Sequence, residues 1–421
     1  MMSRKKPAGV QLKAPDLFVF PRQDALCYIC RLKLRESLRM EEIYLDYNAT
    51  TPVDPEVIAV MADTAERYWA NPSSGHRLGR EAAEALATNR GAIARFVGAD
   101  PDEIIFTAGG TEADNLAVIG AARANRDRGK HILVSSVEHH AILESCEQLE
   151  KEGFEIGRLP VDERGLVNPD DVSRDIRGDT ILISVMHANN EVGTIEPVAE
   201  IGRIAGERGV LFHTDAAQTV GKIPVDVNRL HVDLLTCASH KIYGPKGIGF
   251  LYARAGTPLD PLLVGGGQEK HRRSGTENIP AVAGLARALM IAETRMETEG
   301  DSLRKLRDGL YKRLTEGLDG VTLNGHPTER LPGTLNVSVA GISAAELLVR
   351  LDGEGIFLSA SAACTTERVR PSHVLTAMGI GNRQAATTLR ISLGRATEEH
   401  HIPQVADAII TTVHQLRKDA T

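Results

Sequence analysis

A stretch with two glycines, Thr107-Ala-Gly-Gly-Thr-Glu112, follows an apolar run and precedes a segment of helical character. Glycines let the backbone approach a ligand closely, and the first turn of a helix offers free N–H groups and the positive end of the helix dipole. These features predict a phosphate-binding turn with Gly110 and Thr111 as its contacts. A plain strand-to-helix turn capped by a threonine accounts for the same residues equally well.

An acid and a lysine follow two later apolar runs, at Asp215 and at Lys241. A buried carboxylate is costly unless a cation meets it, and a protonated pyridine nitrogen would be such a cation. A desolvated lysine has a lowered pKa and can bind an aldehyde covalently. Taken one by one, Asp215 could instead cap a helix, and Lys241 could be an ordinary surface lysine, a description that suits Lys246 better.

The three clusters together are more specific than any one of them. In an open parallel sheet, ligands collect at the carboxyl ends of the strands. A phosphate-binding turn, an acid and a lysine, in that order, are what a pyridoxal 5'-phosphate site needs. The sequence therefore predicts an enzyme that uses this cofactor.

Alternating elements are predicted to position these clusters. From about residue 100, short runs rich in Ile, Val and Leu alternate with helix-length segments such as 112–126 and 198–208. This alternation predicts an α/β fold with a mostly parallel central sheet that is covered on both faces. The expected strands span residues 104–106, 132–135, 181–185, 210–213, 234–238 and 248–252.

After residue 280 the pattern predicts a smaller α+β domain. Leucines recur every three or four residues from Leu303 to Leu318, which indicates a helix, and apolar positions from Ile402 to Leu416 indicate another. Between them, residues 335–339 and 389–393 alternate with the period of a strand. We expect a large cofactor-binding domain over residues 55–300, and a small domain formed by residues 42–54 together with 301–421.

The composition restricts the class of protein. The net charge of −7 argues against a general nucleic-acid binder, and no apolar run approaches the roughly 18 residues of a membrane helix. The five scattered cysteines favour a reducing, cytoplasmic compartment over a disulfide framework. Cys27 and Cys30 lack the further ligands of a zinc site, so no metal is expected.

Residues 1–41 differ from the rest of the chain. The first 40 residues hold nine basic side chains against three acidic ones. We expect a basic N-terminal extension that is poorly ordered and dispensable for catalysis. Met40 would serve as a natural first residue, so we interpret the extension as a misassigned start or an address tag.

Longer motifs follow one another in unbroken order over roughly residues 42–415. They are Tyr44-Leu-Asp-Tyr-Asn-Ala-Thr-Thr-Pro52, Asn71-Pro-Ser-Ser-Gly-His76, Phe106-Thr-Ala-Gly-Gly-Thr-Glu-Ala-Asp-Asn115, Glu138-His139, Met186-His-Ala-Asn-Asn-Glu191, Asp215-Ala-Ala-Gln218, His240-Lys-Ile-Tyr-Gly-Pro-Lys-Gly247, Arg273-Ser-Gly-Thr276, Ser361-Ala-Ala-Cys-Thr365 and Arg390-Ile-Ser-Leu-Gly-Arg395. With these motifs the chain resembles the group I cysteine desulfurases of the NifS/IscS type, which are class V aminotransferase-like enzymes. The resemblance implies the aspartate aminotransferase-like fold of the pyridoxal-phosphate enzymes of fold type I.

The resemblance assigns cofactor contacts to individual residues. Lys241 would carry the cofactor and Asp215 would pair with its pyridine nitrogen. Gln218 and Asn190 would form hydrogen bonds with the ring, while His139 would stack on it and help to move protons.

The resemblance also implies phosphate and substrate contacts. Gly110, Thr111 and His240 would hold the phosphate, and Thr276 would reach the phosphate of a neighbouring subunit, which implies a homodimer. Arg390 would bind the carboxylate of the substrate L-cysteine, with Asn71 also at the substrate.

Cys364 lies among small and polar residues without strand alternation, so we expect an accessible, mobile loop. By resemblance, its thiolate takes the sulfur of L-cysteine as a persulfide and leaves alanine. An iron–sulfur scaffold or another acceptor protein, or the machinery of tRNA thiolation, would then receive the sulfur. Nearby Arg368 and Arg370 could favour the thiolate. Cys146 and Cys237 fit inert buried thiols better.

One position departs from the family pattern, and other functions remain open. The family usually has Ser two places before His240, whereas this chain has Ala238, which leaves that phosphate contact undecided. Strand periodicity places Arg390 on the face opposite Leu389 and Ile391. An ordinary arginine on the exposed face of a strand would give the same pattern. The alternatives are a class V aminotransferase or a selenocysteine lyase, which the reaction product would distinguish, and a non-catalytic protein that keeps only the fold.

Overall fold

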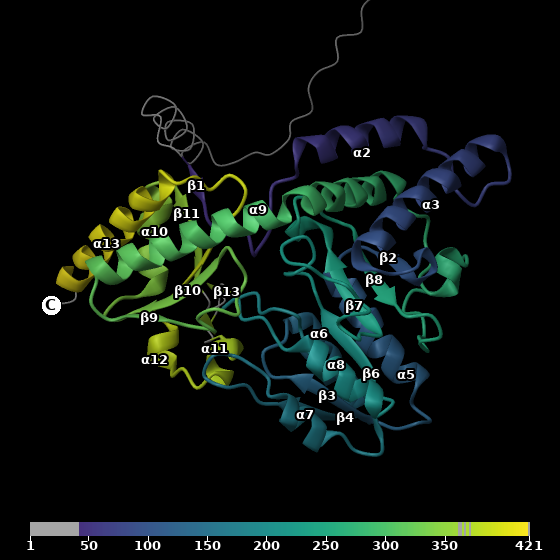
Figure 1. Cartoon of the computed structure of the whole chain (residues 1–421), viewed down its shortest axis with the longest axis horizontal. Coiled ribbons are helices and arrows are strands. Elements are labelled where there is room, and N and C mark those ends of the chain that lie inside the picture. Colours follow the sequence, from purple (N-terminus) through teal and green to yellow (C-terminus); the bar gives the residue numbers. More distant parts are fainter. Residues whose placement is uncertain (1–41, 361–363, 366–367, 370–371, 420–421) are drawn as a thin grey trace, which may run out of the picture. The chain divides into compact units, whose positions relative to one another are not determined.

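The computed structural model describes residues 42–360, 364–365, 368–369 and 372–419. The N-terminal extension and parts of the Cys364 segment lie outside the described residues. From Ile43 onward the chain forms one compact unit that contains a seven-stranded sheet and a smaller four-stranded sheet (Figure 1). Among the described helices, none combines the length and the apolar character that a bilayer span requires.

The seven-stranded sheet has the order β2-β8-β7-β6-β5-β3-β4. Strands from β7 to β4 pair in parallel, and β8 runs antiparallel to both of its neighbours. The strands are β2 (Ile104–Thr107), β3 (His131–Ser135), β4 (Glu155–Leu159), β5 (Thr180–Ser184), β6 (Leu211–Asp215), β7 (Leu234–Ala238) and β8 (Gly249–Ala253). The expected α/β fold with a mostly parallel central sheet is therefore confirmed.

Helices cover both faces of this sheet because successive side chains of each strand point to opposite sides. On β2, Ile104 and Phe106 belong to one core cluster and Ile105 to the other. The first face packs against α3 (Arg77–Val97), α7 (Pro169–Asp175), α8 (Val198–Glu207) and the first part of α9 (Ile279–Gly317), with α2 (Pro55–Arg67) lying along α9. The second face packs against α4 (Gly110–Asn115), η2 (Leu116–Gly120), α5 (Ala121–Ala124) and α6 (His140–Lys151).

The helix expected over residues 112–126 forms, but it contains one wider π-helical turn, η2. Gly120 lies at its end, where a Cβ atom would be only 2.7 Å from the carbonyl oxygen of Asp260. The amide of Asp260 in turn donates to the carbonyl of Gly120 at 3.1 Å. The chain at Asp260 therefore packs closely against the end of this π-helical turn and forms a hydrogen bond with it.

The smaller sheet has the order β12-β15-β10-β9, and all of its pairs are antiparallel. Its apolar face packs against α10 (Ala344–Gly353), α13 (His401–Asp419) and the second part of α9. The strands are β9 (Val321–Leu323), β10 (Thr334–Val339), β12 (Ser359–Ala360) and β15 (Thr388–Ser392), and β1 (Ile43–Tyr44) pairs in parallel with β11 (Ile356–Phe357) nearby. The remaining elements are η1 (Pro101–Glu103), η3 (Ser239–Lys241), η4 (Gln268–His271), β13 (Cys364–Thr365), β14 (Arg368–Val369), α11 (His373–Ala377) and α12 (Asn382–Ala385).

Helix α9 connects the two cores (Figure 1). It is one continuous helix of 39 residues, so the expected boundary at residue 300 falls inside it. Its first part, around Val282 and Leu285, is buried in the core of the large sheet, and Leu310 and Leu314 are buried in the core of the small one. Two separate cores joined by one helix support the division into two domains, which we retain as a proposal.

A turn with unusual backbone angles precedes α9 and is held by a buried ion pair. Glu269, Lys270 and His271 have φ angles of 48°, 57° and 66°, a region that non-glycine residues rarely adopt. The carboxylate of Glu269 accepts hydrogen bonds from Arg90 at 2.6 and 2.8 Å and from the amide of Phe106 at 3.1 Å. The ion pair therefore ties this turn to β2.

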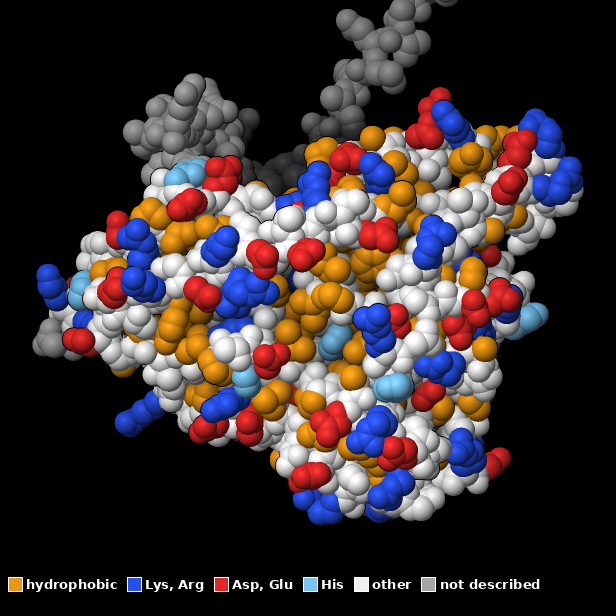
Figure 2. Space-filling model, viewed as in Figure 1, with side chains coloured by type: hydrophobic (Ala, Val, Ile, Leu, Met, Phe, Trp, Pro, Cys, Tyr) orange, Lys and Arg blue, Asp and Glu red, His pale blue; other side chains and the backbone are white. Residues whose placement is uncertain are grey.

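Glu269→Gln is expected to lower the free energy of unfolding by about 3 kcal/mol, because it leaves the Arg90 cation without its partner in the interior. Equilibrium urea unfolding measures the change. A matched control is Glu207→Gln, which removes an exposed ion pair with Arg203. Exposed basic and acidic side chains are mixed over the face of the molecule that Figure 2 shows. That control should cost about 0.5 kcal/mol or less. Equal losses in the two variants would contradict the assigned role of Glu269.

Candidate active site

A cleft of about 400 Å³ opens at the carboxyl end of the parallel strands. Most of the residues predicted from the sequence line it: Gly110, Thr111, His139, Asn190, Asp215, Gln218, His240, Lys241 and Arg390. They come from the segments that follow β2, β3, β5, β6 and β7, and from β15 of the small sheet. The fold therefore brings together groups that are up to 280 positions apart in the sequence, between Gly110 and Arg390.

Lys241 ends the short turn η3, directly after β7. Its ammonium donates to the carbonyl oxygens of Asn48 at 2.7 Å and Ala49 at 2.8 Å. Burial, and secondly the nearby Arg390, lower the pKa of Lys241 to about 8. A larger fraction of this amine is therefore neutral near physiological pH than of a surface lysine, and the neutral amine is the nucleophilic form.

Asp215 ends β6 at the floor of the cleft, with 6% of its surface exposed. Its carboxylate accepts a hydrogen bond from the amide of Ala217 at 2.8 Å, and no described residue forms a salt bridge with it. Burial raises the pKa of Asp215, although His139 and Lys241 act in the opposite direction. A buried carboxylate with one hydrogen bond and no salt bridge among the described residues is well suited to bind a cationic ligand.

Asp114 is a second buried acid beside the cleft, and it was not predicted from the sequence. It lies on α4 and is 2% exposed, and its Oδ1 atom has no hydrogen-bond partner. Burial, and secondly the charge of Asp215, raise its pKa well above the ordinary value. Its neighbours Ala113 and Leu116 are apolar and buried. The feature of the sequence that could have identified Asp114 is therefore a single acidic residue on an otherwise apolar helix face.

Two histidines, His139 and His240, line the cleft. His139 caps α6, and its Nδ1 accepts from the amide of Ala141 at 3.2 Å, so that in the neutral ring the proton lies on Nε2. Partial desolvation lowers the pKa of His139, although the ring is exposed to the cleft. His240 lies 3.1 Å from the hydroxyl of Thr50, and burial together with the Lys241 charge lowers its pKa to about 4.

Arg390 lies on β15 and is mostly buried, with 13% of its side chain exposed. Its Nη2 pairs with Oδ1 of Asp46 at 2.8 Å, and its Nε has no partner. The alternative of an exposed strand arginine is therefore excluded. A guanidinium that lines the cleft with an unused N–H is well suited to bind a carboxylate.

Comparison with known proteins identifies the family of this chain. The sequence model of the family Aminotransferase class-V matches residues 43–405. The chain belongs to the class V aminotransferase family. The cysteine desulfurase IscS of Dictyoglomus turgidum is 46% identical over 376 residues, which cover 89% of this chain and 95% of that protein. The cysteine desulfurase IscS of Methanosarcina thermophila is 46% identical over 384 residues, which cover 90% of this chain and 94% of that protein.

Solved structures of related proteins have the same fold. A NifS-like protein superimposes with a TM-score of 0.84 at 37% identity, covering 89% of this chain and 100% of that one. A NifS-like protein from Rickettsia africae superimposes with a TM-score of 0.80 at 31% identity, with the same coverage. The predicted resemblance to NifS/IscS-type enzymes is therefore confirmed, and so is the predicted fold.

Two of the predicted residues are not brought into the cleft. Asn71 and Thr276 are exposed and do not line it, and the side chain of Asn71 instead accepts from the amide of Ser73 at 2.8 Å. Cys364 was expected in a loop without strand structure, but the backbone of Cys364–Thr365 pairs with Arg368–Val369 as β13 and β14. The side chain of Cys364 lies outside the described part of the chain.

The two other cysteines of the described chain are inert, as expected. Cys146 on α6 and Cys237 on β7 are both fully buried. Burial raises the pKa of the Cys146 thiol to about 12 and raises that of Cys237 as well. Neither thiol is available as a nucleophile, because the thiolate is the reactive form.

Proposed function

We propose that the protein is a pyridoxal 5'-phosphate-dependent cysteine desulfurase, which takes the sulfur of L-cysteine onto Cys364 and releases L-alanine. The observation that carries the proposal is one cleft that joins a desolvated lysine, a buried acid without a cation and an incompletely paired arginine: Lys241, Asp215 and Arg390. The relatives at 46% identity that bear the name cysteine desulfurase support the substrate.

The residues of the cleft fit the cofactor. Asp215 would accept a hydrogen bond from the protonated pyridine nitrogen, which would be the cation that this buried acid lacks. His139 would cover the ring, Gln218 and Asn190 would donate to its substituents, and Lys241 would form the covalent attachment. When bound, pyridoxal 5'-phosphate withdraws electrons from the α-carbon of the amino acid, which makes the α-proton acidic.

The phosphate would lie near the start of α4, where Gly110, Thr111 and His240 face the cleft. Ala238 lines the cleft at this place, and a Cβ atom on Gly110 would be 3.3 Å from that of Ala238. The hydroxyl of Ser239 does not take the place of the serine hydroxyl that the family has at position 238. It is buried and packs directly against Gly244, where an added Cβ atom would lie only 2.0 Å from the Ser239 oxygen.

Ala238→Ser is expected to hold the cofactor about fivefold more tightly, since one hydroxyl hydrogen bond contributes about 1 kcal/mol. The measurement is the dissociation constant of pyridoxal 5'-phosphate from the apoprotein by equilibrium dialysis. Ala238→Val is the control, because it adds volume at the same place without a donor and should weaken binding. Unchanged or weaker binding in Ala238→Ser would show that the phosphate does not lie beside residue 238.

At the substrate end, the guanidinium of Arg390, which lines the cleft, would bind the α-carboxylate of L-cysteine. The amine of Lys241, with its pKa lowered to about 8, would take and return the α-proton. The Cys364 thiolate would attack the substrate sulfur, forming an S–S bond while the C–S bond breaks. Protonation of the carbon that loses sulfur gives alanine.

We also propose a homodimer and a sulfur acceptor. Thr276 is exposed, and so are Leu263 and Val264, with 47% and 81% of their surface accessible. These two segments are neighbours, because the amide of Ser274 donates to the carbonyl of Leu263. An apolar patch beside Thr276 supports contact with a second copy whose phosphate Thr276 would reach. The acceptor would be an iron–sulfur scaffold or another sulfur-acceptor protein, and we propose a cytoplasmic location from the cysteine content.

A single product assay tests the function. The chain is incubated with pyridoxal 5'-phosphate, L-cysteine and a reducing thiol, and alanine and sulfide are quantified together. Equal amounts of the two are expected. Formation of a keto acid without sulfide would identify an aminotransferase instead, and turnover of selenocysteine but not of cysteine would identify a selenocysteine lyase.

A further inference from the structure

Lys222 is a half-buried basic group for which the proposed reaction has no use. It lies one turn after Gln218, in the segment that follows β6, and its Nζ atom donates to Oε1 of Gln218 at 2.7 Å. Burial, and then the charges of Lys241 and Arg390, lower the pKa of Lys222 to about 7. No described carboxylate forms a salt bridge with Lys222, so its main polar partner is the Gln218 amide.

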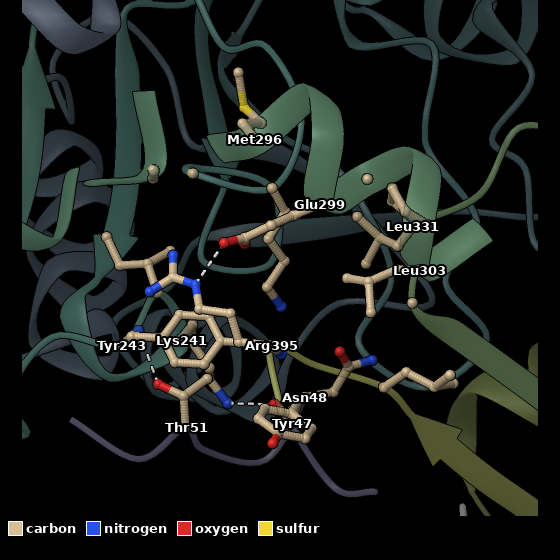
Figure 3. A pocket seen from close by; sticks show the side chains of 18 of the residues that line it. Tyr47, Asn48, Thr51, Lys241, Tyr243, Met296, Glu299, Leu303, Leu331 and Arg395 are labelled. Carbon is tan, nitrogen blue, oxygen red and sulfur yellow. Dashed lines mark hydrogen bonds and ion pairs between the residues drawn. The ribbon is translucent and has the colours of Figure 1, made fainter. Parts of the chain in front are cut away.

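Lys222 and Gln218 face different spaces. Gln218 lines the cleft, whereas Lys222 lines a second, largely enclosed cavity of about 40 Å³. Asn48 and Lys241 line both spaces. Figure 3 shows the second cavity, with the amine of Lys241 joined to Asn48 on one side and Arg395 joined to Glu299 on the other. The cavity has room for about three water molecules, which can solvate the remaining N–H groups of Lys222.

The contacts of Gln218 fix which end of its amide points where. Its Nε2 donates to the carbonyl of Asn48 at 2.9 Å, the same oxygen that accepts from Lys241 at 2.7 Å. An ammonium group donates but cannot accept. A rotated Gln218 amide would place its NH₂ against the Lys222 ammonium and its oxygen against the Asn48 carbonyl, so both hydrogen bonds would be lost.

We propose that Lys222 is a positioning residue that holds the Gln218 amide with its NH₂ group toward the cofactor ring. The inference rests on the proposed function, in which Gln218 donates to that ring. Lys222 itself lies behind Gln218, on the side of the enclosed cavity, and touches neither cofactor nor substrate. Without Lys222 only the hydrogen bond to the Asn48 carbonyl still orients the amide, so the rotated form gains population and donation to the ring is lost in that fraction.

The test compares Lys222→Met, Lys222→Arg, Gln218→Ala and the double variant Lys222→Met/Gln218→Ala. Two properties are measured: the dissociation constant of pyridoxal 5'-phosphate from the apoprotein, and the pH midpoint of the visible absorption band of the bound cofactor. Lys222→Met should weaken cofactor binding about fivefold and shift the midpoint, as the loss of one neutral hydrogen bond from the Gln218 amide to the ring predicts. Lys222→Arg, which keeps a donor, should stay within about twofold of the wild type.

The double variant shows whether Lys222 acts on cofactor binding through Gln218 or independently of it. If Lys222 acts through Gln218, the double variant binds the cofactor no more weakly than Gln218→Ala alone. Losses that multiply in the double variant, or an unchanged Lys222→Met, would overturn the inference. Thermal unfolding of the apoproteins detects a mere folding defect, and Lys222→Leu, which also lacks a donor, serves in place of Lys222→Met if the latter does not fold. Failure of the wild type to bind the cofactor would instead refute the proposed function.

Discussion

Lys241→Ala is expected to abolish turnover and to prevent covalent attachment of pyridoxal 5'-phosphate. The amine of Lys241 lies at the end of β7 beside the buried acid Asp215, and its pKa is lowered to about 8. No other lysine lines the cleft in the described chain. Borohydride reduction followed by peptide mass spectrometry should find the cofactor on Lys241 in the wild type and on no residue in the variant.

Lys246→Ala is the matched control, because Lys246 lies in the same loop but is exposed to solvent. It should keep both turnover and the covalent link. Lys222 provides the sharpest alternative, since it is the other lysine near the site whose pKa burial lowers. Cofactor trapped on Lys222 in the unmodified protein would show that the attachment site has been assigned to the wrong lysine.

Much of the fold could be predicted because most strands of the large sheet are buried on both faces. Such strands give short continuous runs of Ile, Val and Leu, and each expected strand is present within a residue or two of its predicted ends. Strand β4 was missed because it is an edge strand that exposes Glu155 and Arg158, so it has no apolar run. The start of α9 was missed because its first part is rich in alanine and buried nearly all round, which removes the helical period.

The site could be predicted where a residue follows a strand and has a chemically distinctive type, as Asp215 and Lys241 do. Residues whose role depends on contacts across the fold could not be predicted. Asn48 precedes the large sheet in the sequence, yet its carbonyl accepts from both Gln218 and Lys241. Asp114 and Lys222 look like ordinary helix and turn residues, and only burial beside Asp215 and Gln218 distinguishes them.

Cys364→Ala is expected to bind L-cysteine normally but to form no persulfide and to release no sulfur. Arg390, Lys241 and Asp215 line the cleft and supply the contacts proposed for the substrate and the cofactor, so we expect substrate binding not to require the thiol of Cys364. Transfer of sulfur does require a thiolate, and the other two cysteines of the described chain are fully buried with raised pKa values. Loss of turnover with retained binding separates the nucleophile from the groups that activate the substrate.

Two measurements on the Cys364→Ala protein test both halves of this prediction. Addition of L-cysteine should still change the visible spectrum of the bound cofactor, at a concentration within about threefold of that for the wild type, because the contact to the carboxylate remains. Mass spectrometry after persulfide labelling should find the added sulfur only in the wild type, on Cys364. Cys146→Ala serves as the control and should keep full sulfur release. A persulfide on Cys146 or Cys237, with activity retained in Cys364→Ala, would refute the assignment, because sulfur would then reach a thiol that the structure buries.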